Sequence, residues 1–178
     1  DSIVHLGEFW NGEALKKCKS HVLESNEKIK RWFEYAYHYL AAAGNLYDAL
    51  ADIYEDALED GELYKKAAEI IGEEMGHKEI ALNPGCIKKQ FASAITPAGV
   101  QHHLESLIDG YRRIYMITAP VGMSNARLLN LIAESALYRG MDIEAYYCPM
   151  KPETKLEHLL VPQIETAFVS LNSYHDLD

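Results

Sequence analysis

Arg113-Ile114-Tyr115-Met116-Ile117-Thr118 followed by Ala119-Pro120-Val121-Gly122-Met123-Ser124 is the stretch that decides the fold. The first six residues are apolar or β-branched apart from Arg113, which predicts a buried strand. Residues 119–124 predict a loop. Residues 125–139 predict an amphipathic helix that Gly140 ends, with one apolar face made of Leu128, Leu129, Ile132, Ala133 and Ala136. Strand, tight loop and helix, with a further strand behind them, predict a βαβ unit with a parallel crossover.

Short apolar runs on both sides of this stretch predict the rest of an α/β sheet. Strands are expected over 88–95, 142–148 and 166–171. Thr96-Pro97 predicts an N-cap followed by proline at the first helical position, and the helix is expected to run to Asp109-Gly110. The fold class expected for residues 83–178 is therefore α/β, a parallel sheet with flanking helices.

Residues 1–82 predict an α-helical segment. Apolar residues recur every three or four positions from about residue 12 to residue 72, and Asn11 is a plausible N-cap. Breaks are expected at Gly44-Asn45 and at Gly61. The acidic residues at 48–60 predict the solvent side of the second helix. A ligand- or base-stacking surface and core or interhelical packing are both open for the aromatic cluster, and packing is preferred for Trp32, Phe33, Tyr35, Tyr37 and Tyr39.

Composition and charge exclude several classes of protein. Nearly half of the 178 residues are apolar, yet no stretch approaches the roughly 20 uninterrupted apolar residues of a membrane span. The net charge is −10, and an acidic surface without a basic patch argues against nucleic acid as a partner. Cys18, Cys86 and Cys148 lie far apart, which is typical of free thiols in a reducing compartment, so a cytoplasmic location is expected.

The loop after residue 118 occupies the place of a phosphate-binding loop but lacks its chemistry. In GxxxxGK[ST] the glycines expose backbone N–H groups, the lysine reaches the phosphates and the hydroxyl binds magnesium. Here Asn125 stands for the lysine and Ala126 for the hydroxyl residue, and only Gly122 remains as an inner glycine. The candidate nucleotide-binding residues are Ala119, Pro120, Val121, Gly122, Met123, Ser124, Asn125, Ala126 and Arg127.

The chain resembles a family of little-characterised tandem P-loop ATPase-like proteins of spore-forming Gram-positive bacteria. The resemblance covers essentially the whole chain and is carried by residues 3–10, 91–99, 113–139, 147–149 and 160–162. It implies a protein with two P-loop halves joined by helices, of which this chain is the α-helical joiner (residues 1–82) and the second half (residues 83–178). The fold class that the resemblance implies for the second half is a P-loop NTPase-like parallel sheet with flanking helices, in an incomplete domain. An N-terminal P-loop half or a second copy of the chain is the partner that this implies.

Departures from the family pattern fall on polar residues. Family members read GKS or GKT where this chain has Ser124-Asn125-Ala126, and His-Cys-Pro-x-Asp-Pro where Tyr147 and Lys151 replace the histidine and the aspartate. A lysine–phosphate hydrogen bond contributes about 1.5–3 kcal/mol, so its loss predicts weak ATP binding. Without a hydroxyl at Ala126 magnesium lacks its usual ligand, and little or no hydrolysis is expected.

The sequence is consistent with two functions. One is an ATP-binding domain of an ATPase-like protein with weak or no turnover in this half, and the other is a pseudo-NTPase that acts as a structural or protein-interaction module. Whether the chain is an enzyme is left open, and no catalytic residue is assigned. Arg127 and Lys151 are the cations that could replace the missing lysine. A metal or redox role has little support, because His102-His103 and His158 lack a partner at metal-ligand spacing.

Overall fold

The computed structural model describes residues 5–120, 122–123, 125–175 and 177. Contacts divide the chain into two compact units, Asp1–Ala43 and Gly44–Asp178. The helical part of the chain that precedes the sheet ends at Met75, and the first strand begins at Ile87. None of the described helices is long and apolar enough to span a membrane.

A short 3-10 helix, η1 (Leu6–Phe9), is followed by the long helix α1 (Gly12–Ala57). The N-cap prediction is confirmed, because the backbone N–H of Ala14 donates to Asn11 Oδ1 at 3.0 Å. The break predicted at Gly44-Asn45 is wrong, and the helix continues through both residues. Gly44 is instead a packing position, since the Cε atom of Lys151 lies 3.7 Å from where a β-carbon would stand.

The second predicted break is confirmed to within a few residues. The chain leaves helical geometry at residues 58–59, and α2 (Asp60–Met75) begins with Gly61 in its first turn. Asp60 and Glu62 lie in that turn, where the helix dipole favours negative charge. Helix α2 packs on α4 (Ala126–Tyr138). The helix predicted over residues 125–139 is confirmed as α4. Gly140 follows this helix with a φ of 73°.

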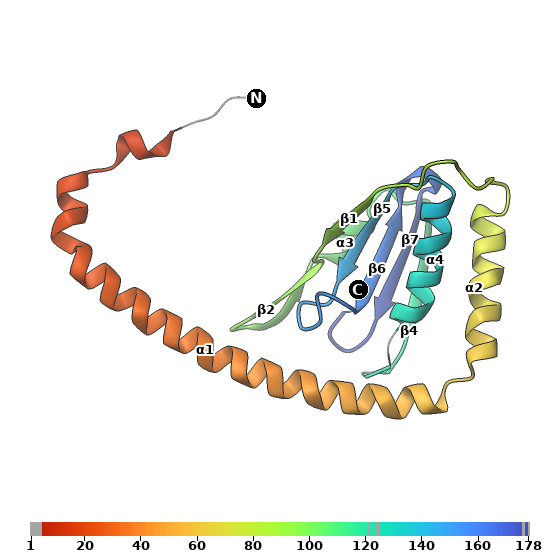
Figure 1. The fold of residues 1–178 in the computed structure, drawn as a ribbon, viewed down its shortest axis with the longest axis horizontal. Helices are drawn as coiled ribbons and strands as arrows, with labels where there is room; N and C mark the ends of the chain where they lie inside the picture. Colours follow the sequence, from red (N-terminus) through yellow and green to blue (C-terminus); the bar gives the residue numbers. More distant parts are fainter. Residues whose placement is uncertain (1–4, 121, 124, 176, 178) are drawn as a thin grey trace. The chain divides into compact units, whose positions relative to one another are not determined.

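The body of the protein is an α/β unit built on a mixed five-stranded sheet (Figure 1). Its order is β1-β5-β6-β7-β4, with the bounds β1 Ile87–Gln90, β4 Arg113–Thr118, β5 Ile143–Tyr147, β6 Leu156–Val161 and β7 Thr166–Leu171. The strands predicted near 113–118, 142–148 and 166–171 are confirmed. The strand predicted over 88–95 is broken at Phe91-Ala92, where the chain leaves the sheet.

The expectation of a wholly parallel sheet is wrong at β6, which pairs antiparallel with both β5 and β7. The connections explain this, because residues 148–155 and 162–165 are too short for the crossover that parallel neighbours need. Strands β1 and β5 pair in parallel, as do β4 and β7. Strands β4 and β5 flank α4 in the sequence but are not neighbours, because β6 and β7 lie between them.

Residues 93–102 form a hairpin instead of the predicted helix start. Strand β2 (Ser93–Thr96) pairs antiparallel with β3 (Gly99–His102), and only α3 (Leu104–Ile108) is helical. Thr96 Oγ1 accepts from the backbone N–H of Ala98 at 3.1 Å and donates to Gly99 O at 2.8 Å. The φ of 97° at Gly99 then turns the chain. Threonine and proline begin turns as readily as helices, and the glycine three residues later decided between them.

The core lies mainly between one sheet face and the two helices α2 and α4. Its largest members include Met75, Leu129, Ile132, Leu156 and Phe168. A smaller cluster on the sheet forms around Tyr146, Leu160 and Ala167, with Leu107 and Ile108 of α3 packed against it. The apolar face predicted for the helix after the loop is therefore confirmed as the face that the sheet buries.

A buried carboxylate joins α2 to the edge of the sheet. The Tyr115 hydroxyl donates to Glu74 Oε1 at 2.5 Å, Arg113 also donates to that carboxylate, and Thr166 Oγ1 donates to Glu74 Oε2 at 3.2 Å. Burial raises the pKa of Glu74, but these hydrogen bonds outweigh burial and hold it below its ordinary value. The charged form of Glu74 therefore stabilises the folded state.

The aromatic cluster of α1 is not packed. Trp32, Phe33, Tyr35, Tyr37 and Tyr39 are all exposed, so core packing is wrong for the described chain, and interhelical packing with another chain stays a prediction. Trp32 and Tyr35 contact each other edge to face, and Phe33 stacks on Tyr37. The acidic residues predicted on the solvent side between 48 and 60 are exposed, as expected.

Candidate functional site

The predicted phosphate loop connects β4 to α4 at the carboxyl end of the parallel strands. Ala119 is buried, and the backbone N–H of Met123 donates to Pro120 O at 3.1 Å. Gly122 is buried with a φ of 99°, and a β-carbon there would lie 2.5 Å from Leu50 Cγ. Leu50 of α1 therefore lies against the glycine that resembles the inner glycine of a P-loop. Val121 and Ser124 lie outside the described residues.

Asn125, at the position where a phosphate-binding loop would carry its lysine, has a structural role. Its Nδ2 group donates to Ile117 O and to Ser170 Oγ, each at 3.2 Å. The side chain therefore joins the ends of β4 and β7 and does not extend away from the sheet. Ala126, the next residue, is buried at the start of α4. The two positions that would carry the phosphate chemistry thus contribute to the packing of the sheet edge.

Both substitute cations have internal carboxylate partners. Arg127 donates to both carboxylate oxygens of Asp60, at 2.5 and 3.1 Å, and to the hydroxyl of Tyr64. These hydrogen bonds raise the pKa of Arg127. Lys151 Nζ lies 2.5 Å from Asp48 Oδ2. Asp60 and Asp48 thus supply the negative charge that a phosphate would bring.

A groove of about 530 Å³ runs beside these pairs, between the last turns of α1, the start of α4 and residues 151–155. Arg127, Lys151 and Lys155 line it, and so do the carboxylates of Asp48, Asp52 and Glu55. The groove is therefore mixed in charge. A separate cavity of only about 10 Å³ lies between the loop and the sheet, and it is close to the smallest size that holds one water molecule.

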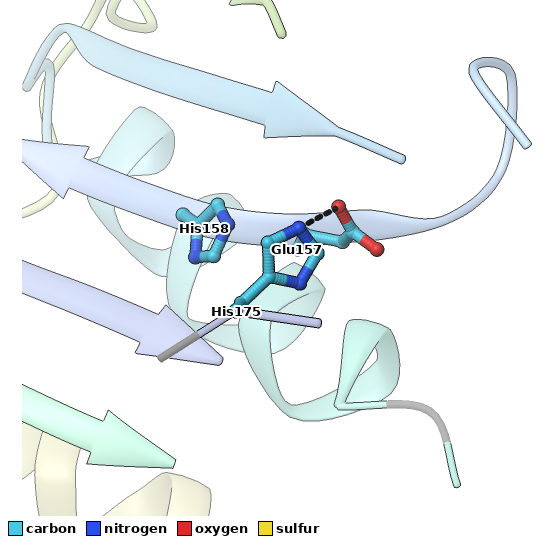
Figure 2. A group of neighbouring side chains, drawn as sticks. All are labelled: Glu157, His158 and His175. Atoms are coloured by element: carbon cyan, nitrogen blue, oxygen red, sulfur yellow. Dashed lines mark ion pairs between the residues drawn. The ribbon is translucent and has the colours of Figure 1, made fainter. Parts of the chain in front are cut away.

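A second cluster, the buried histidine cluster, consists of Glu157, His158 and His175 (Figure 2). Glu157 and His158 lie in β6, and His175 follows β7. Adjacent residues of a regular strand point to opposite faces. Here Tyr146 pairs with His158 and Tyr147 with Leu156, so Glu157 has no partner on β5 and forms a bulge. The bulge lets two consecutive side chains approach His175.

The cluster is buried and electrostatically coupled. Lys155 Nζ lies 3.3 Å from Glu157 Oε1, and His175 Nε2 lies 3.7 Å from Glu157 Oε2 (dashed in Figure 2). Burial lowers the pKa of His158 to about 3, with additional effects from His175, His102 and Lys155. Burial also lowers the pKa of His175, although Glu157 opposes that shift. Both rings are therefore neutral near pH 7.

The same region holds a lysine and a thiol. Burial alone lowers the pKa of Lys155, but its hydrogen bond to Tyr47 and its contact with Glu157 raise the pKa overall. Burial raises the pKa of the Cys148 thiol, and the charge of Glu157 adds to that effect. Cys148 is therefore a neutral buried thiol and not an activated nucleophile.

The possible metal-ligand atoms of the histidine cluster lie within 4.8 Å of one another, so the residues could hold a metal ion. The hydrogen bonds decide whether they fit one. The backbone N–H of Ser170 donates to His158 Nδ1 at 3.2 Å, so the neutral ring carries its proton on Nε2. A metal on Nε2 would require the proton to move to Nδ1, where it would face another N–H group. Metal-bound histidines instead donate from the second nitrogen. The tautomer of His158 therefore does not fit a metal ligand.

The cluster instead offers hydrogen-bond donors to an oxygen atom. His158 Nε2 and His175 Nε2 are buried without a hydrogen-bond partner among the described residues. A buried water would satisfy them, as is common at such sites. Spacing along the sequence does not reveal the partner of His158, because His175 is 17 residues away and comes near only through the β6–β7 turn. The bulge that turns Glu157 leaves no signal in the sequence.

Comparisons with known proteins add no assignment. No protein-family model matches the chain, and neither a curated protein nor a solved structure matches it. The resemblance drawn from sequence motifs therefore stays a hypothesis.

Proposed function

We propose that this chain is a protein-interaction module built on a P-loop-like α/β domain whose phosphate loop no longer serves catalysis. The observation that carries the proposal is the contact between Leu50 and Gly122, because a side chain of the protein covers the backbone that would face a phosphate. Asn125 supports it through its bonds to Ile117 and Ser170. The location proposed for the module is the cytoplasm.

Binding calorimetry on the full chain with ATP, with and without magnesium, tests the proposal. No measurable heat at millimolar ATP is expected for the natural sequence. The matched variant is Leu50→Ala, which uncovers Gly122 without adding a charge. If the proposal holds, this variant gains at most weak phosphate binding, because the lysine is still missing. Tight magnesium-dependent ATP binding by the natural sequence would refute it.

Nucleotide binding by the second half of an ATPase-like protein is the second candidate. The groove of about 530 Å³ favours it, because Arg127, Lys151 and Lys155 line a space of ligand size beside the start of α4.

Restoring the loop tests this second candidate. The triple variant Ser124→Gly, Asn125→Lys and Ala126→Ser should tighten ATP binding by at least about tenfold. The matched control keeps Ser124→Gly and Ala126→Ser but carries Asn125→Gln, which has a long polar side chain without the charge. An unchanged affinity in the restored variant counts against this candidate.

A further inference from the structure

The exposed face of α1 between residues 12 and 43 has a regular seven-residue period. Apolar residues stand at alternating spacings of three and four, with Ser25 as the one polar exception. This seam consists of Leu15, Cys18, Val22, Ser25, Ile29, Trp32, Ala36, Tyr39 and Ala43. Such a 3.5-residue period matches the seam of a left-handed coiled coil and not the slightly longer period of a helix packed on a globular core.

The seam residues are accessible in the described structure. Val22 is 47% exposed and Tyr39 is 79% exposed, and Cys18 is exposed as well. A helix in water depends on the burial of an apolar face for most of its stability. Residues 12–43 span about 48 Å at 1.5 Å per residue, so the exposed apolar face is long enough to pair with a helix of similar length.

Charge is segregated away from the seam. Residues 12–43 hold ten Asp, Glu, Lys and Arg side chains, and none of them lies in the seam. Only Lys19 and Lys28 stand in the positions that flank it. In a parallel pair, Lys19 would face Ala14 of the second helix and Lys28 would face Phe33. Parallel pairing of two copies therefore brings no like charges together at the flanks.

We infer that the partner is a second copy of this chain, paired through the seam as a parallel, in-register coiled coil. The inference rests on the proposed interaction function and names its partner. Parallel pairing sets Ser25 opposite Ser25, so the two hydroxyls satisfy each other, whereas antiparallel pairing would set each against an apolar seam residue. Ala36 and Ala43 leave room for the large rings of Trp32 and Tyr39, as alternating large and small side chains do in well-packed cores.

Sedimentation equilibrium of the full chain tests this pairing with two neighbouring variants. Val22→Glu places a charge in the seam, and Leu23→Glu places the same charge one residue away, outside it. The two residues are similarly exposed, at 47% and 54%. We expect a dimer for the natural chain, a dissociation constant at least about 100-fold higher for Val22→Glu, and a change within about threefold for Leu23→Glu. Equal effects of both variants, or a monomer at about 100 μM natural chain, would overturn the inference.

Oxidative cross-linking fixes the direction and register. Parallel pairing sets Cys18 opposite Cys18 in one layer, within reach of a disulfide. Mild oxidation should therefore cross-link the Cys86→Ser variant, which keeps Cys18, and should not cross-link Cys18→Ser, although Cys86 is also exposed. A dimer linked only through Cys86 would overturn the parallel register.

The two proposals fail separately. Tight ATP binding would refute the proposed interaction function while the sedimentation and cross-linking results stand on their own. A monomeric natural chain that binds no ATP would overturn only the choice of a second copy as partner. Circular dichroism of Val22→Glu adds a check, since loss of the dimer should lower helical content in a concentration-dependent way while Leu23→Glu retains it.

Discussion

The two compact units differ in which side chains they expose and which they bury. In the N-terminal unit, Val22, Ile29 and Trp32 are exposed, whereas in the C-terminal unit the polar side chains of Glu74, Glu157 and His158 are buried. Burying a charge is costly unless hydrogen bonds or ion pairs compensate it. The body provides that compensation internally, while α1 leaves apolar surface without compensation. The difference is that the body pairs the charges of Glu74 and Glu157 with its own residues, whereas α1 leaves apolar side chains exposed.

The largest expected effect comes from removing a carboxylate that pairs with several polar side chains of the body. Glu74→Ala removes the shared acceptor of Arg113, Tyr115 and Thr166, and we expect the free energy of unfolding to fall by about 3 kcal/mol. Glu69→Ala, on the exposed side of the same helix, is the matched control and should cost less than about 0.5 kcal/mol. Urea denaturation measures both. Equal costs would show that the Glu74 network does not anchor α2 to the sheet.

A second prediction separates the covered loop from an open turn. Gly122 and Gly99 both have positive φ, near 99° and 97°, but only Gly122 has a neighbour within 4 Å. Gly99→Ala should cost about 1 kcal/mol from backbone strain, and Gly122→Ala about 2 kcal/mol or more, since Leu50 must also move. In the Leu50→Ala background the cost of Gly122→Ala should approach that of Gly99→Ala. A constant cost would mean that Leu50 does not cover the loop.

The pH dependence of stability sharpens the contrast in buried polarity. The pKa of His158 is lowered to about 3 in the folded state, so the unfolded chain binds the proton first as pH falls below about 6.5. Stability therefore decreases between pH 6.5 and 3, by up to about 1.4 kcal/mol per pH unit for this residue. The lowered pKa of His175 acts in the same direction.

Urea denaturation midpoints between pH 7.5 and 5 measure this loss of stability. That pH range lies above the one in which Glu74 protonates. His158→Gln should flatten the profile, whereas His21→Gln, at an exposed position of α1, should leave its slope unchanged. An identical slope in the natural chain and His158→Gln would contradict the burial of a neutral ring.

The smallest expected effect concerns metal. Because His158 Nδ1 accepts from the Ser170 N–H, zinc at 100 μM should raise the melting temperature of the full chain by less than about 1 °C, and chelation should lower it as little. Differential scanning calorimetry measures both. A zinc-dependent stabilisation that His175→Ala abolishes and His21→Gln retains would show that the cluster binds metal after all.

Sequence periodicity was most informative where neighbours in sequence decide the structure. The helix of 126–138, its buried face, the strands at 113–118 and 166–171 and the N-cap at Asn11 were all predictable, since each depends on spacing or on one local hydrogen bond. Turn chemistry was ambiguous at Thr96-Pro97, because the same residues begin helices and turns. Gly44 did not break its helix, and in the folded chain it is buried beside Lys151.

Strand β6 was missed because Glu157 and His158 interrupt its apolar pattern. Strand β6 is buried because β5 and β7 lie on either side of it. The free-energy cost of burying its two polar side chains depends on their contacts with Lys155, His175 and Ser170. The candidate site shows the same limit. The loop could be located from the strand before it and the helix after it, but Leu50, which covers it, lies about 70 residues earlier in the chain.

The sequence by itself determined the α/β class, the helical character of the N-terminal segment and the seven-residue seam, because these depend on residue identity and local period. Only the tertiary structure decided the antiparallel insertion of β6, the contact of Leu50 with Gly122, the partners of Arg127 and Lys151, and the tautomer of His158. Each of these is a contact between segments far apart in the chain. Such contacts are selected by packing and by the pairing of buried polar groups, and single-segment patterns do not encode them.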